Sequence, residues 1–176
     1  MPFDLQPTLT GPRLELRPLR PEDYAELYAA ASDPRIWEQH PVSDRYKEDV
    51  FRDEYFRGAL ASGGAFVVID RATGRVIGSS RYFGFDEERS EIEIGWTFLA
   101  RAYWGGSYNG EMKDLMLRHA FRFVSTVVFL VGPDNRRSQR AMEKIGGVRV
   151  GVTRREPGDR ENVVFRIART SLIPDH

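Results

Sequence analysis

Apolar residues recur along the chain with two different periods, and these periods separate predicted strands from predicted helices. Alternation of apolar and charged residues over 13–17 predicts a half-buried strand, and Pro21 followed by Glu22 and Asp23 marks the start of a helix. Apolar residues at helical spacing predict a second helix over 46–62. Further strands are predicted over 65–70, 76–83, 91–99, 127–131, 148–153 and 163–168.

Two more helices are predicted in the second half of the chain. One starts near Asn109 and keeps its apolar residues on one face as far as Phe123, and the other spans 135–145 before Gly146-Gly147. The resulting order is β-α-α-β-β-β-α-β-α-β-β, with hairpins in the middle and helical crossovers later. This order predicts a mixed, mostly antiparallel α/β (α+β) sheet of about seven strands flanked by about four helices. The length of 176 residues suits one domain over 1–176.

Composition excludes several classes of function. Cysteine is absent, which excludes disulfides, thiolate catalysis and zinc–thiolate sites, and the three dispersed histidines show no metal-ligand spacing. The 26 basic and 26 acidic residues cancel, which argues against general nucleic-acid binding. No apolar segment approaches the roughly 20 residues of a membrane span, and the N-terminus does not read as a secretory signal. We therefore expect a cytoplasmic protein with no metal, nucleic-acid or membrane partner.

A glycine-rich turn at Gly105-Gly106 lies between the strand ending near Leu99 and the helix starting near Asn109. Glycines let a backbone approach a phosphate closely, and a helix N-terminus offers unpaired N–H groups. The turn therefore has the ingredients of an anion site, although it is neither a Walker P-loop nor a dinucleotide fingerprint. A second interpretation stays open, in which the turn is only a tight connection with Asn109 as N-cap and Glu111 in the first helical turn.

Four segments together resemble the GNAT acetyltransferases. Residues 13–19 read Arg-Leu-Glu-Leu-Arg-Pro-Leu, and residues 93–99 read Glu-Ile-Gly-Trp-Thr-Phe-Leu. Residues 103–109 carry Tyr-Trp-Gly-Gly-Ser-Tyr-Asn, and residues 135–146 carry Asn-Arg-Arg-Ser-Gln-Arg-Ala-Met-Glu-Lys-Ile-Gly. The segments follow the family order over nearly the whole chain. The most similar branch includes the ribosomal-protein alanine acetyltransferases.

This resemblance implies a binding site for acetyl-CoA as cosubstrate. The strand residues that would pair with the pantetheine arm, like an added strand, are Trp96, Thr97, Phe98 and Leu99. The turn residues that would wrap the pyrophosphate are Trp104, Gly105, Gly106, Ser107, Tyr108, Asn109 and Gly110. Asn135 would contact the coenzyme arm near the thioester. The chain departs from the common family pattern at Ser107 and Asn109, and 135–147 lacks the tyrosine that many members use as a proton donor.

Acetylation of an amine needs a base for the ammonium proton and a donor for the departing thiolate. Glu91 and Glu93 are spaced two apart on a predicted strand and so share one face, and the resemblance favours Glu93 as the catalytic base. The Asn-x-x-Ser pattern of a related branch implies Ser138 as the catalytic acid. Alternatively, the two glutamates lie on a solvated strand face. The segment with Asn135 and Ser138 would then be an ordinary helix start with Asn135 as its cap.

The resemblance also bears on less specific residues. The segment with Trp37 and His40 would border the acceptor pocket in this family, although a lone loop histidine usually has no such role. Three arginines of the last predicted helix either meet the 3′-phosphate of the coenzyme or form a solvated helix face; they are Arg136, Arg137 and Arg140.

The expected function is therefore an acetyl-CoA-dependent N-acetyltransferase. It would move an acetyl group to a primary amine, on a protein N-terminus or a small molecule, by direct attack on the thioester. Dimers are common in the family, so a homodimer is a further expectation. The alternatives are a non-catalytic acetyl-CoA-binding or regulatory module, an interaction protein that keeps only the fold, and an acyltransferase for longer chains. Coenzyme binding and turnover with a panel of amines would separate them.

Overall fold

The computed structural model describes residues 2–171, and these residues build one eight-stranded sheet. The spatial order of the strands is β1-β2-β3-β4-β5-β6-β8-β7. Neighbouring strands are antiparallel except for β5 and β6, which run parallel. The strands are β1 (Leu9–Thr10), β2 (Leu14–Pro18), β3 (Ala65–Asp70), β4 (Val76–Asp86), β5 (Glu91–Leu99), β6 (Thr126–Val131), β7 (Val148–Thr153) and β8 (Asn162–Ala168).

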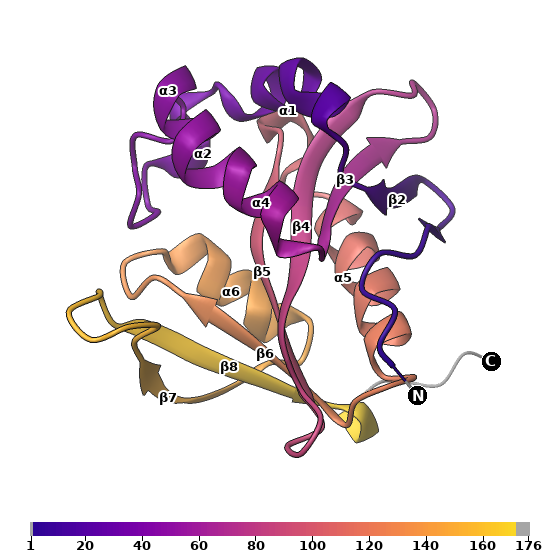
Figure 1. The fold of residues 1–176 in the computed structure, drawn as a ribbon, viewed down its shortest axis with the longest axis vertical. Helices are drawn as coiled ribbons and strands as arrows, with labels where there is room; N and C mark the ends of the chain where they lie inside the picture. Colours follow the sequence, from indigo (N-terminus) through magenta and orange to yellow (C-terminus); the bar gives the residue numbers. More distant parts are fainter. Residues whose placement is uncertain (1, 172–176) are drawn as a thin grey trace.

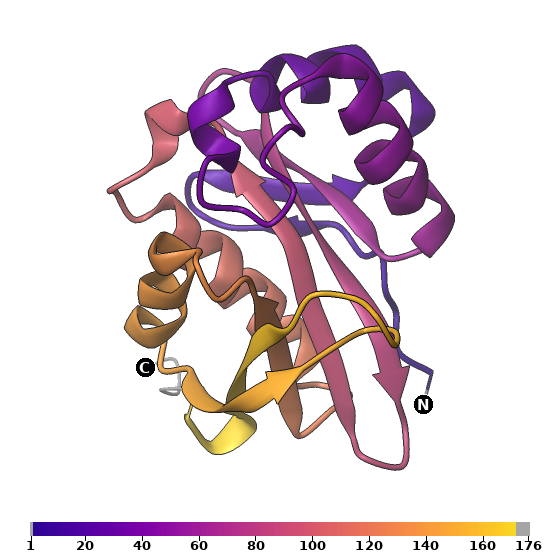
Figure 2. The same ribbon diagram turned by 90° about the vertical axis from the view of Figure 1, so that its left-hand side faces the viewer.

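Six α-helices accompany the sheet in the described residues: α1 (Tyr24–Ala31), α2 (Pro34–Trp37), α3 (Glu48–Phe51), α4 (Arg57–Ser62), α5 (Tyr108–Ala120) and α6 (Arg136–Lys144). Figure 1 shows α1–α4 gathered at one end of the long strands β4 and β5, with α6, β6, β7 and β8 at the other. The view turned by 90° shows the same division (Figure 2). The mixed, mostly antiparallel α/β architecture confirms the predicted fold class.

The element count differs from the prediction in three places, each for a local reason. The two-residue strand β1, which pairs Leu9 with Leu16, is too short to leave a periodic signal. The short helix α2 rests on its cap, the Asp33 side chain, which accepts from the backbone N–H of Arg35. The helix predicted over 46–62 begins at Glu48 and consists of α3, a π-helical turn and α4.

The start of α5 also differs from the prediction. The helix begins at Tyr108, with Ser107 in the cap position, so Asn109 lies inside the first turn and is not the N-cap. It ends at Ala120, so Phe123 lies beyond it. The predicted cap of the last helix is confirmed, because the Asn135 side chain accepts from a backbone N–H in the first turn of α6.

Two hydrophobic cores lie on opposite faces of the sheet. Alternation along β3 divides its side chains, with Phe66 and Val68 in one core and Ala65 and Val67 in the other. The first core is covered by α5 through Met112 and its neighbours on the same helix face. The second core is filled by aromatic side chains from α2, α3, β5 and the helical turn between α3 and α4: Trp37, Phe51, Tyr55, Phe56 and Phe98.

The parallel pair β5–β6 separates after three paired positions, of which the last is Glu93 with Val128. On its other side β5 shifts register against β4 between Ser79 and Arg81, and Trp96 lies within this irregularity with φ at 52°. A positive φ is strained for a bulky residue and marks a bulge that bends the strand. The edge of β5 that faces β6 therefore has no strand partner beyond Glu93 within the described residues.

Close packing between β4 and β5 gives the first test. An added Cβ at Gly78 would overlap the carbonyl oxygen of Phe98, so Gly78→Ala should lower the free energy of unfolding by about 1–3 kcal/mol. The control is Gly110→Ala in α5, where nothing lies within 4 Å and alanine should add about 0.5–1 kcal/mol. Urea unfolding measures both, and equal stabilities for the two variants would contradict the packing.

Candidate active site

A cavity of about 800 Å³ runs between the end of β5, the glycine-rich turn and α6. Five basic side chains line it, namely Lys113, Arg136, Arg137, Arg140 and Lys144. No aspartate or glutamate is among its described lining residues. Because opposite charges attract most strongly where water is partly excluded, this cavity suits a polyanionic ligand.

The turn at the mouth of the cavity is fixed by the side chain of Trp104. Its indole N–H donates to the carbonyl of Leu99 at 2.9 Å, and the guanidinium of Arg137 lies 3.8 Å from its ring centre. Gly105 has φ at 73°, a conformation that glycine adopts without cost, and an added Cβ at Gly106 would meet only the ring of Tyr108 at 3.6 Å. The conformation of the turn is therefore fixed, and no side chain at Gly105 or Gly106 covers its backbone.

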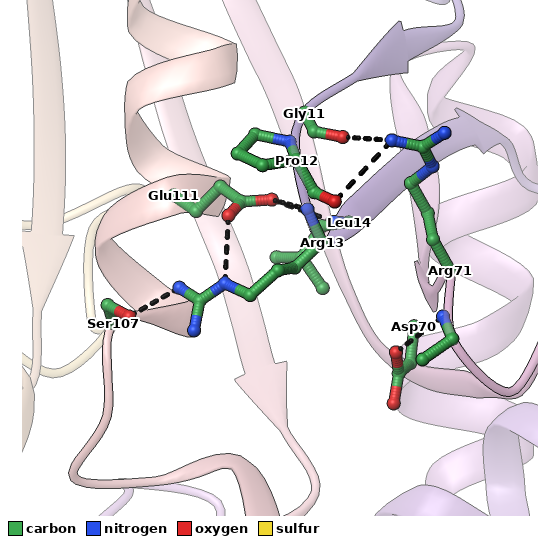
Figure 3. A network of polar contacts seen from close by, with 9 residues as sticks. Gly11, Pro12, Arg13, Leu14, Asp70, Arg71, Ser107 and Glu111 are labelled. Atoms are coloured by element: carbon green, nitrogen blue, oxygen red, sulfur yellow. Dashed lines mark hydrogen bonds and ion pairs between the residues drawn. The ribbon is translucent and has the colours of Figure 1, made fainter.

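The first turn of α5 is tied to β2 by Glu111 (Figure 3). Its carboxylate accepts from the backbone N–H groups of Arg13 and Leu14 at 3.0 and 2.7 Å, and from the Arg13 side chain at 3.2 Å. The same guanidinium donates to the hydroxyl of Ser107. The Glu111 carboxylate is thus bound to Arg13 and Leu14 and lines neither cavity. It therefore leaves the start of α5 open to an anionic ligand.

A second cavity of about 90 Å³ lies where β5 and β6 part. Its walls include Gly95 and Trp96 from β5 and Phe129 and Leu130 from β6. It shares with the larger cavity the residues Trp37, His40, Thr97, Lys113, Asn135, Ser138 and Met142. The two cavities therefore adjoin, and the shared residues mark the place where ligands in them would meet.

Most of the predicted coenzyme residues line the larger cavity: Thr97, Phe98, Leu99, Trp104, Gly105, Gly106, Ser107, Asn109, Gly110 and Asn135. Trp96 lines only the smaller cavity. Tyr108 lines neither, because its ring packs at 5.0 Å against Tyr103 and lies under the Arg13 guanidinium at 4.3 Å. Ser138 lines both cavities, as do Trp37 and His40.

The two predicted base candidates both take part in ion pairs. Glu93 is 7% exposed, and its two oxygens accept from the two terminal nitrogens of Arg155 at 2.8 and 2.5 Å. Glu91 accepts from Arg166 at 2.9 Å. Neither glutamate lines a cavity, so the nearest wall residues of β5 are the ones that follow Glu93.

Lys113 is a site residue that the sequence did not single out for chemistry. It is buried at the junction of the two cavities, and its Nζ donates to the hydroxyl of Thr97 at 2.9 Å, which in turn contacts the hydroxyl of Ser80 at 2.7 Å. Among the ion pairs of the described residues none includes Lys113. Burial without a counter-ion lowers the pKa of Lys113 to about 7.

Across residues 2–171, no three His, Asp or Glu side chains come together in a group able to hold a metal ion. No helix in that part of the chain combines the length and apolar character needed to cross a membrane.

Comparisons with known proteins agree with this geometry. Residues 13–148 match the family model of the acetyltransferase (GNAT) domain. A protein from T. thermophilus described as an acetyltransferase is 29% identical, with a TM-score of 0.75 over 97% of this chain and 92% of that one. Mycobacterium smegmatis RimJ in complex with CoA-disulfide is 19% identical, with a TM-score of 0.69 over 94% and 88% of the two chains.

A third structure is described as a ribosomal-protein-serine acetyltransferase from Vibrio cholerae. It is 17% identical, with a TM-score of 0.76 over 94% of this chain and 99% of that one. No curated protein matches the chain at a significant level.

The match over 13–148 and the shared fold place the chain among the acetyltransferases. The chain belongs to the GNAT acetyltransferase family, and it is an N-acetyltransferase. The family uses acetyl-CoA as donor. The family model confirms the resemblance of the sequence to the GNAT acetyltransferases.

The buried lysine gives a test that depends on pH. Because the pKa of Lys113 falls from 10.5 to about 7 on folding, the unfolded chain binds more protons between these values, and stability rises with pH across this window. Lys113→Met removes this contribution. The variant should exceed the wild type in free energy of unfolding by about 1 kcal/mol or more at pH 7, and the difference should shrink towards pH 10.

Urea unfolding at the two pH values measures this difference. Lys144→Met is the matched control, because Lys144 lines the same cavity but is exposed, and it should change stability little at either pH. If wild type and Lys113→Met differ in stability by the same amount at both pH values, folding does not lower the pKa of Lys113.

Proposed function

We propose that this protein is an acetyl-CoA-dependent N-acetyltransferase that acts on a primary amine by direct attack on the thioester. One observation carries the proposal: a cavity with five basic residues and no described carboxylate lies beside the unpaired edge of β5. Acetyl-CoA matches both features, because it is an anion at its phosphates and carries amide groups along its pantetheine arm.

The coenzyme would use the two features at different places. Amides of the pantetheine arm pair with the backbone of β5 over 96–99, where no described strand pairs with the edge that faces β6, as an added strand would. The pyrophosphate lies against the turn over 104–110 and the start of α5, where open backbone and the helix N-terminus favour anions. The arginines of α6 that line the cavity supply charge for the remaining phosphate.

The chemistry would take place where the two cavities meet. The amine nitrogen bonds to the acetyl carbon, the carbon–sulfur bond breaks, and the amine proton leaves to a base. We assign Glu93 as this base, acting through water, because an ionised carboxylate has about four lone-pair sites and Arg155 uses two of them. Ser138 donates to the leaving thiolate, and Asn135 contacts the coenzyme arm beside it; both line the junction.

A second candidate is a module that binds acetyl-CoA without turnover. The pairing of Glu93 with Arg155 favours it, because both oxygens of the assigned base are already occupied. The same fold and coenzyme cavity would serve either function. Acetyl-CoA binding without release of free coenzyme A from any amine would identify the module.

Several finer assignments remain predictions. The acceptor is a small-molecule amine or a protein N-terminus, and the location is the cytoplasm. The homodimer has one feature in its favour, because the edge strand β7 exposes three valines, Val148, Val150 and Val152, at 52–62%.

The coenzyme site is tested by a charge at the turn. Because an added Cβ at Gly106 makes only an ordinary contact with the Tyr108 ring, Gly106→Asp should fold and place a carboxylate beside the pyrophosphate. Its Kd for acetyl-CoA should rise at least tenfold, about 1.4 kcal/mol or more, by isothermal titration calorimetry. Gly106→Asn has the same shape without the charge and should bind within about threefold of the wild type. Equal affinities of all three proteins for acetyl-CoA would show that the phosphates do not bind at this turn.

The base is tested by removing the carboxylate charge from each candidate in turn. Glu93→Gln should lower the rate roughly 10²–10⁴-fold near neutral pH, with much of it recovered at higher pH, where free amine is abundant. Glu91→Gln is the matched control on the same strand face and should cost less than about threefold. A loss below threefold for Glu93→Gln at pH 7 would remove Glu93 from the mechanism.

A further inference from the structure

Arg45 is a buried cation that forms no ion pair with the described part of the chain. It lies between α2 and α3, is 7% exposed and lines the small cavity. Its guanidinium is 5.6 Å from the ring centre of Trp37 and 5.4 Å from that of Tyr55. Its Nε has no hydrogen-bond partner, and none of the ion pairs in the described part of the chain includes it. A buried, unpaired charge is costly, so such an arrangement calls for a ligand that completes it.

His40 beside it offers a second hydrogen-bond donor to the same place. Its Nδ1 accepts from the backbone N–H of Val42 at 2.9 Å, and since that group can only donate, Nδ1 carries no proton. Burial and the nearby Arg45 charge lower the pKa of His40 to about 3, so the neutral ring carries its proton on Nε2. This nitrogen lies 3.3 Å from Nη1 of Arg45, so two donors face each other without an acceptor between them.

The charged side chains that line the small cavity, Arg45 and Lys113, are both basic. Arg81 is 6% exposed, packs 4.2 Å from the Trp96 ring and belongs to no ion pair of the described chain. Lys113 lines the cavity from the opposite face of the sheet. No aspartate or glutamate is among the described residues that line it. An acceptor that brought only an ammonium group would meet repulsion from these cations.

We propose that the acceptor is a small molecule carrying a carboxylate next to its amine, as an amino acid does, and that Arg45 and the Nε2–H of His40 bind this carboxylate. The proposal rests on the proposed function and specifies its substrate class. A carboxylate would accept hydrogen bonds from both donors, and its negative charge would pair with the positive charge of Arg45. The cavity volume of about 90 Å³, roughly that of three waters, suits a small acceptor. The amine would then face Ser138 at the junction with the larger cavity.

The test compares each common L-amino acid with its α-amide as acceptor, because the amide keeps the amine and the side chain but lacks the negative charge. Release of free coenzyme A from acetyl-CoA gives kcat/KM for each. For the best pair, the acid should exceed the amide at least tenfold in the wild type. Arg45→Gln should lower this ratio at least tenfold, and Arg45→Lys, which keeps the charge but not the planar fork, should lower it less. Calorimetry with acetyl-CoA reports whether each variant is folded.

The other outcomes are distinct. An amide or a peptide N-terminus that equals or exceeds the free acid would overturn the carboxylate site, as would an unchanged ratio in Arg45→Gln, while leaving the proposed function intact. No binding of acetyl-CoA to the wild type would overturn both. If acetyl-CoA binds but no amine is acetylated, the affinities of N-acetylglycine and N-acetylglycinamide for the CoA-bound protein decide: preference for the acid supports the site, and equal affinity overturns it.

Discussion

The early separation of β5 from β6 is the constraint on which the rest of the site depends. Parallel pairing covers only three positions, and beyond Glu93 the two strands enclose a cavity instead of a ladder. The bend lies at Trp96, whose backbone has a strained, positive φ. The carbonyl of Trp96 accepts a hydrogen bond from the hydroxyl of Tyr55. The guanidinium groups of Arg81 and Arg155 each lie 4.2 Å from the centre of the Trp96 ring. A buried tyrosine and two cation–π contacts thus stabilise a conformation that costs about 1–3 kcal/mol by itself.

The second organising feature is the uneven distribution of charge around the cavities. Basic side chains line them and described acidic side chains do not, although the net charge of the whole chain is zero. Glu111, in the first turn of α5, is held on β2 by contacts directed away from the cavities. The larger cavity therefore suits the anionic coenzyme that we propose, and the smaller one buries Arg45 and Lys113, neither of which forms an ion pair within the described part of the chain. Such burial costs stability in the unliganded protein, and this cost is recovered when an anion binds.

The sequence predicted the features that are encoded locally. Hydrophobic periods located the long elements, the glycine pair located the turn, and Asn135 located the start of α6. The residues that set the chemistry of the acceptor side could not be found this way. Arg155 meets Glu93 across 62 positions of sequence, and Arg45 lies in a segment with no periodic pattern. The bulge at Trp96 left no signal either, because tryptophan is an ordinary strand residue.

We propose that the edge of β5 facing β6 and the turn before α5 hold the coenzyme. Amide hydrogen exchange of the wild-type protein, measured with and without acetyl-CoA, tests it most directly, because it reports on backbone N–H groups one by one. We expect slower exchange on binding at 96–99 and at 105–110, where the arm and the pyrophosphate would lie. Unchanged exchange in both segments, with protection confined to another part of the sheet, would contradict it.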